Sequence, residues 1–427
     1  MTITRRHLLA LSGGIAATAA LSACGTNTGR TSASPTATGG GASAKPNLSQ
    51  WYHAYGEDGV QDAVKTWASE FDGANVTVNW VASDYEKGVS TALLTDNAPD
   101  IFEYANGPTL DMIKAGQAAD LTDVVGDAKD SFTPRVMERL TYQGKIWAVP
   151  QTVDMQLLYY RPSLLAKARL QPPTTLDALV AAAKAQKTND MGGFFAGNDG
   201  GLGVLGSLLI WGAGLEQISA DKKSAGFNDA RLYAAVGTFK SFFDSGALLK
   251  SASTDWSDAT PFINGETAMQ WGGLWDLPKV KQAFGDDVGV LPFPSTGNGG
   301  RPAVPFGAFS SVVNAHGKNV ETAKQFVQWL WVDSEDKQVQ FSNAFGCHIP
   351  AKPKLFSEAD KVASGQGAQA AKFVSDHGFV DDLFWTPAAS QAYSTALSNV
   401  VKSGRDARTE FTAAADKVAA ELKRVNG

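Results

Sequence analysis

Strand-like and helix-like segments alternate along residues 48–115, and few folds accommodate that order. Three segments have the pattern of strands, namely residues 48–55, 76–81 and 99–104. Helical spacing of apolar residues or helical composition marks three others, namely residues 58–71, 85–94 and 109–115. A β-α-β-α-β order predicts parallel strands covered by helices on both faces, so we expect an α/β fold.

Polar and aromatic side chains follow the ends of two of these strands. They are His53 and Tyr55 after the first strand, and Tyr104 and Asn106 at the end of the third. Ligands of parallel sheets bind at the carboxyl ends of the strands. These four residues are therefore candidate ligand-binding residues.

Residues 1–23 have the features of an export signal. Arg5 and Arg6 precede an apolar stretch over residues 8–20, which is shorter than the roughly 20 residues of a membrane-spanning helix. The stretch ends in Leu-Ser-Ala-Cys at residues 21–24, which resembles a bacterial lipobox and implies cleavage before Cys24 and lipidation of that residue. The paired arginines resemble a twin-arginine signal, and a Sec route stays open.

Residues 24–47 are predicted to form the lipidated cysteine and a flexible tether. Gly, Ser, Thr and Ala dominate the segment after Cys24, and such a composition does not form a packed core. If Cys24 carries lipid, then Cys347 has no partner for a disulfide within the chain. The net charge is −6, and no run of basic residues occurs, which argues against a nucleic-acid partner. We therefore expect anchoring to the outer face of the bacterial cell membrane through the lipid.

Five segments carry a resemblance to a known family. They are Asn-Ala-Pro-Asp-Ile at 97–101, Tyr-Gln-Gly-Lys-Ile-Trp-Ala-Val-Pro at 142–150 followed by 153–161, Pro-Thr-Thr-Leu at 173–176, Asn-Gly-Glu-Thr-Ala-Met at 264–269 with Trp-Gly-Gly-Leu-Trp behind it, and 321–330. In this order they resemble the extracellular solute-binding proteins of ABC importers, in particular the carbohydrate-binding branch that includes maltose-binding protein. The resemblance extends over residues 48–427.

The resemblance implies a two-lobed, periplasmic-binding-protein-like α/β fold with a hinge and a central ligand cleft. The chain would cross between the lobes near Asp154, Phe309 and Ile349. The N-terminal lobe would comprise residues 48–153 plus 310–348, and the C-terminal lobe residues 154–309 plus 349–427. Such a protein captures a carbohydrate, here a di- or oligosaccharide, by cleft closure and delivers it to the permease subunits of an ABC transporter. It would be a monomer without cofactor, metal or catalytic residues.

Tryptophan is the residue type that best fits a sugar ligand, because an aromatic plane covers the apolar face of a sugar ring. Trp211, Trp256, Trp271, Trp275 and Trp385 belong to the second lobe, and each one is either a sugar platform or part of the core. The resemblance favours Trp275, which occupies the position of the family's stacking tryptophan. Its neighbours Gly272 and Gly273 allow close backbone approach.

Asp154 is the strongest polar candidate, since it interrupts an apolar strand-like run where an unpaired carboxylate is costly. The resemblance places it where relatives have an acid that bonds sugar hydroxyls. A structural pair with Arg161, or with a helix end, is the alternative. Gly307 and Phe309 resemble the segment at the second crossing, with Phe in place of the commoner Trp or Tyr. Trp211, Trp271, Gly273 and Trp385 complete the candidate ligand-binding residues.

The sequence leaves four alternative functions, and one of them is an importer protein for a non-sugar solute. Residues 201–206 fit the dinucleotide pattern G-x-G-x-x-G, but Asn-Asp-Gly rather than a strand precedes them. A secreted glycoside hydrolase would also combine aromatic platforms with acids such as Asp154 and Glu103. A surface adhesion or scaffolding lipoprotein would leave the tryptophans unexplained. The histidines are scattered at 53, 316, 348 and 377, and no metal motif occurs.

Overall fold

The computed structural model describes residues 45–427. The predicted signal peptide, Cys24 and most of the predicted tether lie outside this range. The first part of the chain forms β1 (Asn47–His53), α1 (Val60–Glu70), β2 (Asn75–Val81), α2 (Tyr85–Ala92), β3 (Ile101–Ala105), α3 (Leu110–Lys114), α4 (Thr122–Val125), α5 (Pro134–Arg139), β4 (Thr141–Tyr142), β5 (Lys145–Ile146) and β6 (Val149–Tyr160).

The middle part forms α6 (Pro162–Lys167), α7 (Leu176–Gln186), β7 (Phe194–Phe195), α8 (Gly206–Gly212), α9 (Ala230–Asp244), β8 (Leu248–Leu249), α10 (Thr260–Ile263), β9 (Met269–Gly273), α11 (Leu277–Phe284), β10 (Gly289–Leu291) and β11 (Val304–Val313). The last part forms α12 (Val320–Val327), α13 (Glu335–Ala344), β12 (Ile349–Pro350), α14 (Asp360–Ala363), α15 (Gly365–His377), β13 (Gly378–Phe379), α16 (Pro387–Ser403) and α17 (Ala407–Asn426). Short 3₁₀ turns at Gly126–Ser131, Leu274–Asp276 and Pro353–Leu355 and a π-helical turn at Gln328–Asp333 complete the list.

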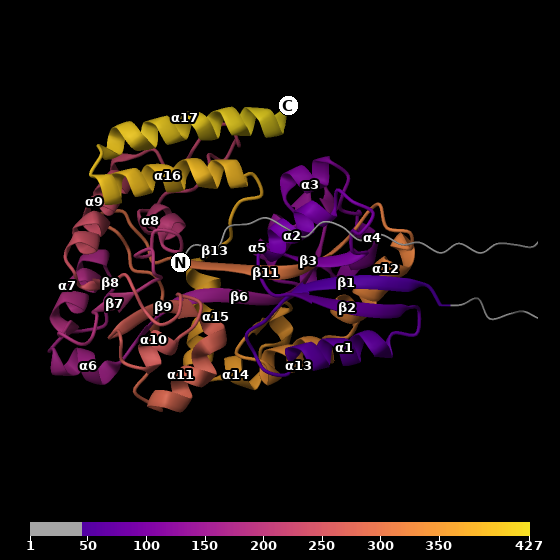
Figure 1. Ribbon diagram of the computed structural model, residues 1–427, viewed down its shortest axis with the longest axis horizontal. Coiled ribbons are helices and arrows are strands. Elements are labelled where there is room, and N and C mark those ends of the chain that lie inside the picture. The colour runs from indigo at the N-terminus through magenta and orange to yellow at the C-terminus, as the bar shows by residue number, and fades with distance from the viewer. Residues whose placement is uncertain (1–44) are drawn as a thin grey trace, which may run out of the picture. The chain divides into compact units, whose positions relative to one another are not determined.

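The predicted β-α-β-α-β order is confirmed at the start of the sheet. β1 pairs in parallel with β2 on one side and with β3 on the other, and α1 and α2 form the connections (Figure 1). Burial along β1 alternates because successive side chains point to opposite faces, and Leu48 and Tyr52 enter the core. The strands continue in the order β2-β1-β3-β11-β6-β9-β7-β8.

Strand β6 connects the two halves of this sheet. Its first half pairs antiparallel with β11, where Asp154 lies opposite Gly307, and its second half pairs with β9. β12 also pairs with β6, with Ile349 opposite Val153. The three predicted crossing points, near Asp154, Phe309 and Ile349, therefore lie side by side.

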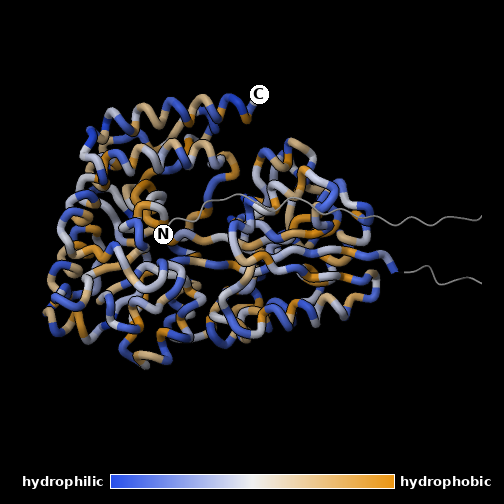
Figure 2. The backbone as a smooth tube through the Cα atoms, viewed as in Figure 1, coloured by the Kyte–Doolittle hydropathy of each residue, from blue (hydrophilic) through white to orange (hydrophobic). Residues whose placement is uncertain are grey.

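Two hydrophobic cores support the two halves. One forms around β1, β3 and α1, and the other around α8, α9, α16 and α17. The two long C-terminal helices are amphipathic, and Figure 2 shows polar and apolar residues alternating along them. The first core also contains Phe262, Leu277 and Val374 from segments predicted for the C-terminal lobe, so the lobe boundaries stay a prediction.

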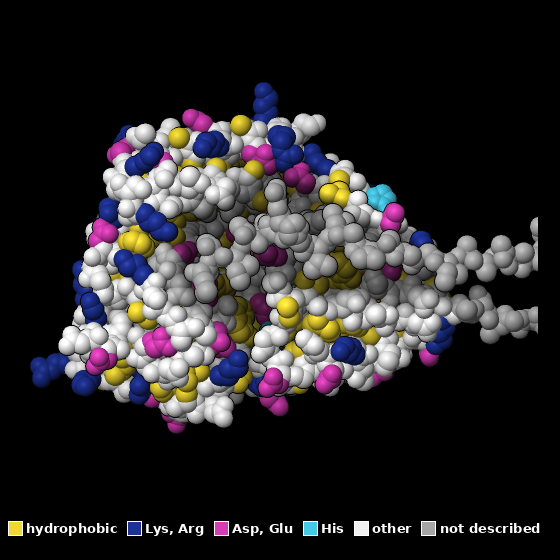
Figure 3. Space-filling model, in the orientation of Figure 1, with side chains coloured by type: hydrophobic (Ala, Val, Ile, Leu, Met, Phe, Trp, Pro, Cys, Tyr) yellow, Lys and Arg dark blue, Asp and Glu magenta, His cyan; other side chains and the backbone are white. Residues whose placement is uncertain are grey.

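Charged side chains of both signs are interspersed on the face shown in Figure 3. Within residues 45–427 no helix combines the length and apolarity needed to cross a bilayer. The helix starts are locally encoded: Thr175 caps α7 by accepting a hydrogen bond from the backbone N–H of Ala178 at 3.2 Å, as the sequence predicts.

Candidate functional site

A cavity of about 720 Å³ lies where β6, β11 and the end of β3 meet the helices and loops of the second half. This volume is within the range of about 300–1,000 Å³ that small-molecule sites occupy. Seven of the predicted ligand-binding residues line it: Asn106, Asp154, Trp211, Trp275, Gly307, Phe309 and Trp385.

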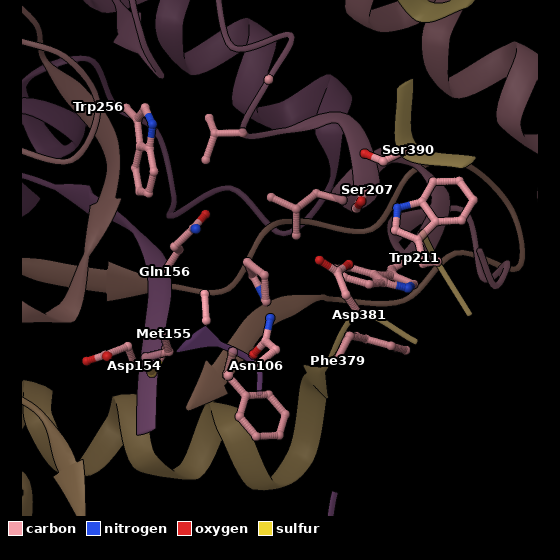
Figure 4. A pocket seen from close by; sticks show the side chains of 18 of the residues that line it. Asn106, Asp154, Met155, Gln156, Ser207, Trp211, Trp256, Phe379, Asp381 and Ser390 are labelled. Carbon is pink, nitrogen blue, oxygen red and sulfur yellow. The ribbon is translucent and has the colours of Figure 1, made fainter. Parts of the chain in front are cut away.

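Aromatic rings form opposing parts of the cavity wall. Trp256 and Trp275 meet edge to face, with ring centroids 6.1 Å apart, and Trp211 stacks on Phe379 at 5.1 Å with nearly parallel planes. Figure 4 shows Trp256 and Trp211 on opposite sides of the cavity. Two planar surfaces that face one space suit a flat, partly apolar ligand.

Trp275 owes its position to Gly273. A Cβ atom at position 273 would lie 2.0 Å from the indole of Trp275, so only glycine lets the ring fold back over the strand. The indole Nε1 donates a hydrogen bond to the carbonyl oxygen of Ser257 at 2.9 Å, which fixes the ring plane. Gly273 itself does not line the cavity.

Asn106 and Gly307 are also mutually dependent. Asn106 has a left-handed backbone (φ 59°), and its N–H donates to the carbonyl oxygen of Ala308 at 3.0 Å. A Cβ atom at position 307 would lie 1.6 Å from Asn106 Oδ1. The glycine therefore leaves room for the amide at the cavity wall.

Asp154 has a partner that the sequence did not indicate. Its Oδ1 lies 2.5 Å from Nδ1 of His348, and the other ring nitrogen of His348 lies 3.0 Å from a carboxylate oxygen of Glu57. Arg161, the partner considered from the sequence, instead donates to Asp287 at 2.8 Å. The alternative of an Asp154–Arg161 pair is therefore wrong.

His53 and Tyr55 lie next to the cavity but do not line it. The ring of His53 lies between those of Tyr55 and Phe309, with centroid distances of 3.9 and 4.2 Å. Buried Glu103 accepts hydrogen bonds from the backbone N–H of His53 at 2.7 Å and from the hydroxyl of Tyr55 at 2.8 Å. Burial raises the pKa of Tyr55, and the charge of Glu103 raises it further. His53 and Phe309 also line a neighbouring cavity of about 510 Å³ beside α2.

Tyr104 and Trp271 are packed behind the cavity. Tyr104 is 8% exposed, and Trp271 is 1% exposed. The indole of Trp271 donates to the side-chain oxygen of Gln156 at 2.9 Å, so it supports a residue that does line the cavity. A direct part for these two aromatics in ligand binding stays a prediction.

Several lining residues were not singled out from the sequence as site residues. They are Gln156, Asp199, Ser207, Asp255, Phe379, Asp381 and Ser390, whereas Trp256, which the sequence left open as platform or core, also lines the cavity. Gln156 could have been found, because residues two apart on a strand share a face and Asp154 was already a candidate. The others lie in loops, near helix starts or in the two-residue strand β13, where no periodic pattern marks them.

The cavity contains no cationic side chain among the lining residues that the structure describes, whereas four aspartates contribute to it. Burial raises the pKa of Asp381, and its carboxylate accepts a hydrogen bond from Gln217 at 2.6 Å. Within residues 45–427 no group of three or more His, Cys, Asp or Glu side chains is arranged to hold a metal ion. Cys347 is buried and unpaired in this part of the chain.

An α/β fold with two cores and a polar, aromatic-walled cavity at the strands between them defines a ligand-binding protein of the two-lobed type. The model of the family "Bacterial extracellular solute-binding protein" matches residues 53–331, and the chain belongs to this family. Its members are binding proteins of transporters rather than enzymes, and they act outside the cytoplasm.

The sequence identity to individual relatives is low. The chain is 26% identical over 303 residues to the diacetylchitobiose binding protein DasA of Streptomyces coelicolor, which covers 68% of this chain and 69% of the relative. It is 23% identical over 266 residues to the maltotriose-binding protein of Pyrococcus abyssi, covering 59% of this chain and 55% of the relative.

Solved structures share the fold. The GacH receptor of Streptomyces glaucescens has a TM-score of 0.74 at 22% identity, covering 90% of this chain and 99% of its own. A solute-binding protein of Thermotoga lettingae, bound with α-D-tagatose, has a TM-score of 0.74 at 19% identity, covering 88% and 100%. At these identities the likeness supports the two-lobed fold alone.

Proposed function

We propose that this chain captures a carbohydrate, a di- or oligosaccharide, in the 720 Å³ cavity and delivers it to the permease subunits of an ABC transporter. The observation that carries the proposal is the composition of the cavity wall. The aromatic side chains of Trp211, Trp256 and Trp275 line this space together with carboxylate, amide and hydroxyl groups. Sugar rings present the complementary surfaces, an apolar C–H face and a polar edge of hydroxyl groups.

The charged residues that line the cavity indicate whether the bound sugar is neutral or charged. The lining residues include Asp154, Asp199, Asp255 and Asp381 and no lysine, arginine or histidine within the described chain. A uronic acid or sugar phosphate would enter without a cationic partner, and desolvating its charge there is costly. The wall therefore favours a neutral sugar. The relatives named for diacetylchitobiose and maltotriose bind neutral sugars, which agrees with this choice.

Capture would proceed by cleft closure. Asn106 and Asp154 approach the cavity from the predicted N-terminal lobe and the first crossing, whereas the tryptophans belong to the predicted C-terminal lobe. A ligand that contacts both sides stabilises the closed arrangement by its differential affinity for it. Cys24, which lies outside the described residues, would carry the lipid that holds a monomeric binding protein near the permease.

Binding calorimetry on the full chain tests this function. The panel consists of diacetylchitobiose, maltose, maltotriose, laminaribiose and tagatose, with galacturonic acid as the charged control. We expect one neutral di- or oligosaccharide to bind and to be recovered uncleaved, and galacturonic acid not to bind. Binding of none of the neutral sugars, or recovery of cleaved sugar, contradicts the proposal.

Trp275→Ala provides the site-specific version of the test. Loss of a stacking surface is expected to weaken binding of that sugar at least about tenfold. The matched control is Trp329→Ala, because Trp329 packs against Phe71 and Phe326, remote from the cavity wall. Its affinity should be unchanged. Equal affinity losses in both variants would show that the effect of Trp275→Ala is not specific to the cavity, which would contradict sugar binding there.

A further inference from the structure

His348 lies at the point where three distant segments meet. It precedes β12 and is 2% exposed. Nδ1 faces Asp154 on β6 at 2.5 Å, and Nε2 faces Glu57, in the loop after β1, at 3.0 Å. Asp154 and Glu57 are 194 and 291 residues from it in the sequence. The ring of Phe341 on α13 covers it at a centroid distance of 5.2 Å.

The two contacts determine the charge of the ring. A neutral imidazole carries one N–H and can donate from one nitrogen only, whereas an imidazolium donates from both. Both ring nitrogens of His348 face carboxylate oxygens, so the ring is an imidazolium between two anions. Burial alone lowers the pKa of His348, but the charges and hydrogen bonds of Asp154 and Glu57 outweigh burial and raise it to about 9.

The neighbouring charged groups leave this arrangement intact. Burial raises the pKa of Glu57, but the hydrogen bond and charge of His348 outweigh it, so the pKa of Glu57 is lowered. The ammonium of Lys361 on α14 is engaged by the carbonyl oxygen of Gly346 at 2.6 Å, and His53 on β1 is engaged by Glu103. Burial raises the pKa of the Cys347 thiol to about 12, so the thiol is neutral.

The contact with His348 determines how the carboxylate of Asp154 is oriented. Its side chain is 17% exposed and lines the cavity (Figure 4). His348 engages Oδ1, whereas Oδ2 has no hydrogen-bond donor within residues 45–427. A carboxylate held at one oxygen keeps a single rotamer and presents the other oxygen in a fixed direction. Orientation of a group before binding lowers the entropic cost of the bond that it then makes.

We propose that His348 is a positioning residue for sugar binding: its imidazolium orients Asp154 so that Oδ2 accepts a hydrogen bond from a sugar hydroxyl, while its second N–H is anchored by Glu57. The role rests on the proposed function and deepens it. Glu57 fixes the far side of the ring, so the direction of Asp154 depends on the loop after β1 as well as on β6.

Two substitutions at this position separate the two contacts. His348→Asn places an amide N–H₂ near the position of Nδ1, so it can donate to Asp154 but does not reach Glu57. His348→Gln places its amide near the position of Nε2 and reaches Glu57 alone. Calorimetry with the tightest-binding panel sugar should show an affinity loss of about tenfold for His348→Gln and a loss under about threefold for His348→Asn.

Thermal unfolding is measured on the same variants, because a purely structural role would lower both midpoints without separating the affinities. Exposed His316→Gln is the control and should bind as the unaltered chain does. Equal affinities of the two His348 variants, or full affinity of His348→Gln, overturn the positioning role alone. Failure of the unaltered chain to bind any sugar overturns the proposed function and this role with it.

A measurement on the unaltered chain keeps the proposal testable if the variants do not fold. Nitrogen-15 NMR of the histidine rings at pH 7.5 should show both nitrogens of His348 protonated. The affinity for the same sugar should be constant between pH 7 and 8 and should fall several-fold by pH 10, as the imidazolium is lost. A neutral His348 ring at pH 7.5, or an affinity independent of pH up to 10, overturns the proposal.

Discussion

Gly307 occupies a position where one methyl group would change the cavity. It lies opposite Asp154 in the β6–β11 ladder, and its missing side chain leaves room for Asn106. Gly307→Ala should force the Asn106 amide to rotate, because Cβ would lie 1.6 Å from Oδ1. We expect sugar affinity to fall about fivefold, as for one lost hydrogen bond, with a stability change under about 1 kcal/mol.

The control is Gly237→Ala on the exposed surface of α9, where a Cβ atom meets nothing within 4 Å. Alanine there should raise the free energy of unfolding by up to about 1 kcal/mol and leave affinity unchanged. Calorimetry and urea unfolding measure both quantities. An unchanged affinity of Gly307→Ala would show that the Asn106 amide makes no contact with the ligand.

His348 also makes the stability of the protein depend on pH. Its folded-state pKa, about 9, exceeds the unfolded value of about 6.5, so its contribution is complete below pH 6.5 and is lost as pH rises through 9. Between pH 7 and 9 we expect the free energy of unfolding to decrease by about 2 kcal/mol from this group.

Urea unfolding at pH 7, 8 and 9 measures this slope, and subtraction of the slope of His348→Asn isolates the residue. The subtraction is needed because Glu103 also raises the pKa of His53 against the opposing effect of burial. Buried Asp276, whose pKa burial raises to about 7, titrates mainly below this window. Identical slopes in both proteins would show that His348 is not charged in the folded state.

At the scale of elements, α16 begins beside the cavity, and its cap connects stability to binding. Thr386 Oγ1 accepts from the N–H of Ala389 at 3.2 Å and donates to Glu421 of α17 at 2.8 Å. Its neighbour Trp385 lines the cavity. Thr386→Ala should cost about 1–2 kcal/mol of stability and weaken sugar binding severalfold, because the helix start that positions Trp385 loosens.

Thr175→Ala is the matched comparison, since Thr175 caps α7 in the same way but does not line the cavity. It should cost about 1 kcal/mol of stability without affecting affinity. Thr386→Ser should restore both properties, because serine keeps the hydroxyl. If Thr175→Ala and Thr386→Ala lose affinity in proportion to their loss of stability, the effect is global, and a local effect at the start of α16 is contradicted.

The elements were largely predictable, because each rests on a local periodic pattern. The strand and helix patterns of residues 48–115 correspond to β1 through α3 within a few residues at each end. Asn106, a candidate that follows the end of β3, lines the cavity because parallel pairing fixes where the strands end. The periodicity of the apolar residues and the composition are therefore sufficient to predict these elements.

The rest of the site depends on packing that no local pattern records. Phe379 and Asp381 come from the segment between α15 and α16, which has no strong periodicity and is placed by contacts such as Trp211 with Phe379. His348 is one of five histidines in the sequence, and nothing in its neighbours indicates a partner 194 residues away. Trp271 has the same residue type as Trp275 but points into the core.

At the scale of the whole molecule, α3 and α17 hold together parts of the chain on either side of the cavity. Arg424 of α17 forms an ion pair with Asp111 of α3 at 3.0 Å, and Lys114 donates to the backbone carbonyl of Val425. α3 follows Asn106 directly, whereas α17 packs on α16. Figure 1 shows the C-terminal end of α17 extending toward α3. These contacts connect segments predicted to belong to different lobes, so we expect them to restrain movement of those lobes relative to one another.

Arg424→Ala should loosen this restraint. Both partners of the ion pair are about half exposed, so the loss of stability should be small. The sugar-free protein should nevertheless expand measurably by small-angle X-ray scattering, and affinity should fall up to about fivefold, because more of the protein starts from an open arrangement. Added salt should have the same effect on the unaltered chain, since it screens exposed charges.

Arg408→Ala on the same helix is the control, because Arg408 lies over the ring of Tyr233 and away from α3. It should leave the radius of gyration and the affinity unchanged. A compact Arg424→Ala protein with full affinity would show that the α3–α17 contact follows lobe movement and does not limit it. An expanded variant that binds sugar as tightly as before would show that closure is driven by ligand contacts alone. Expansion together with weaker binding is the result expected if the contact contributes to the closed arrangement before the ligand arrives.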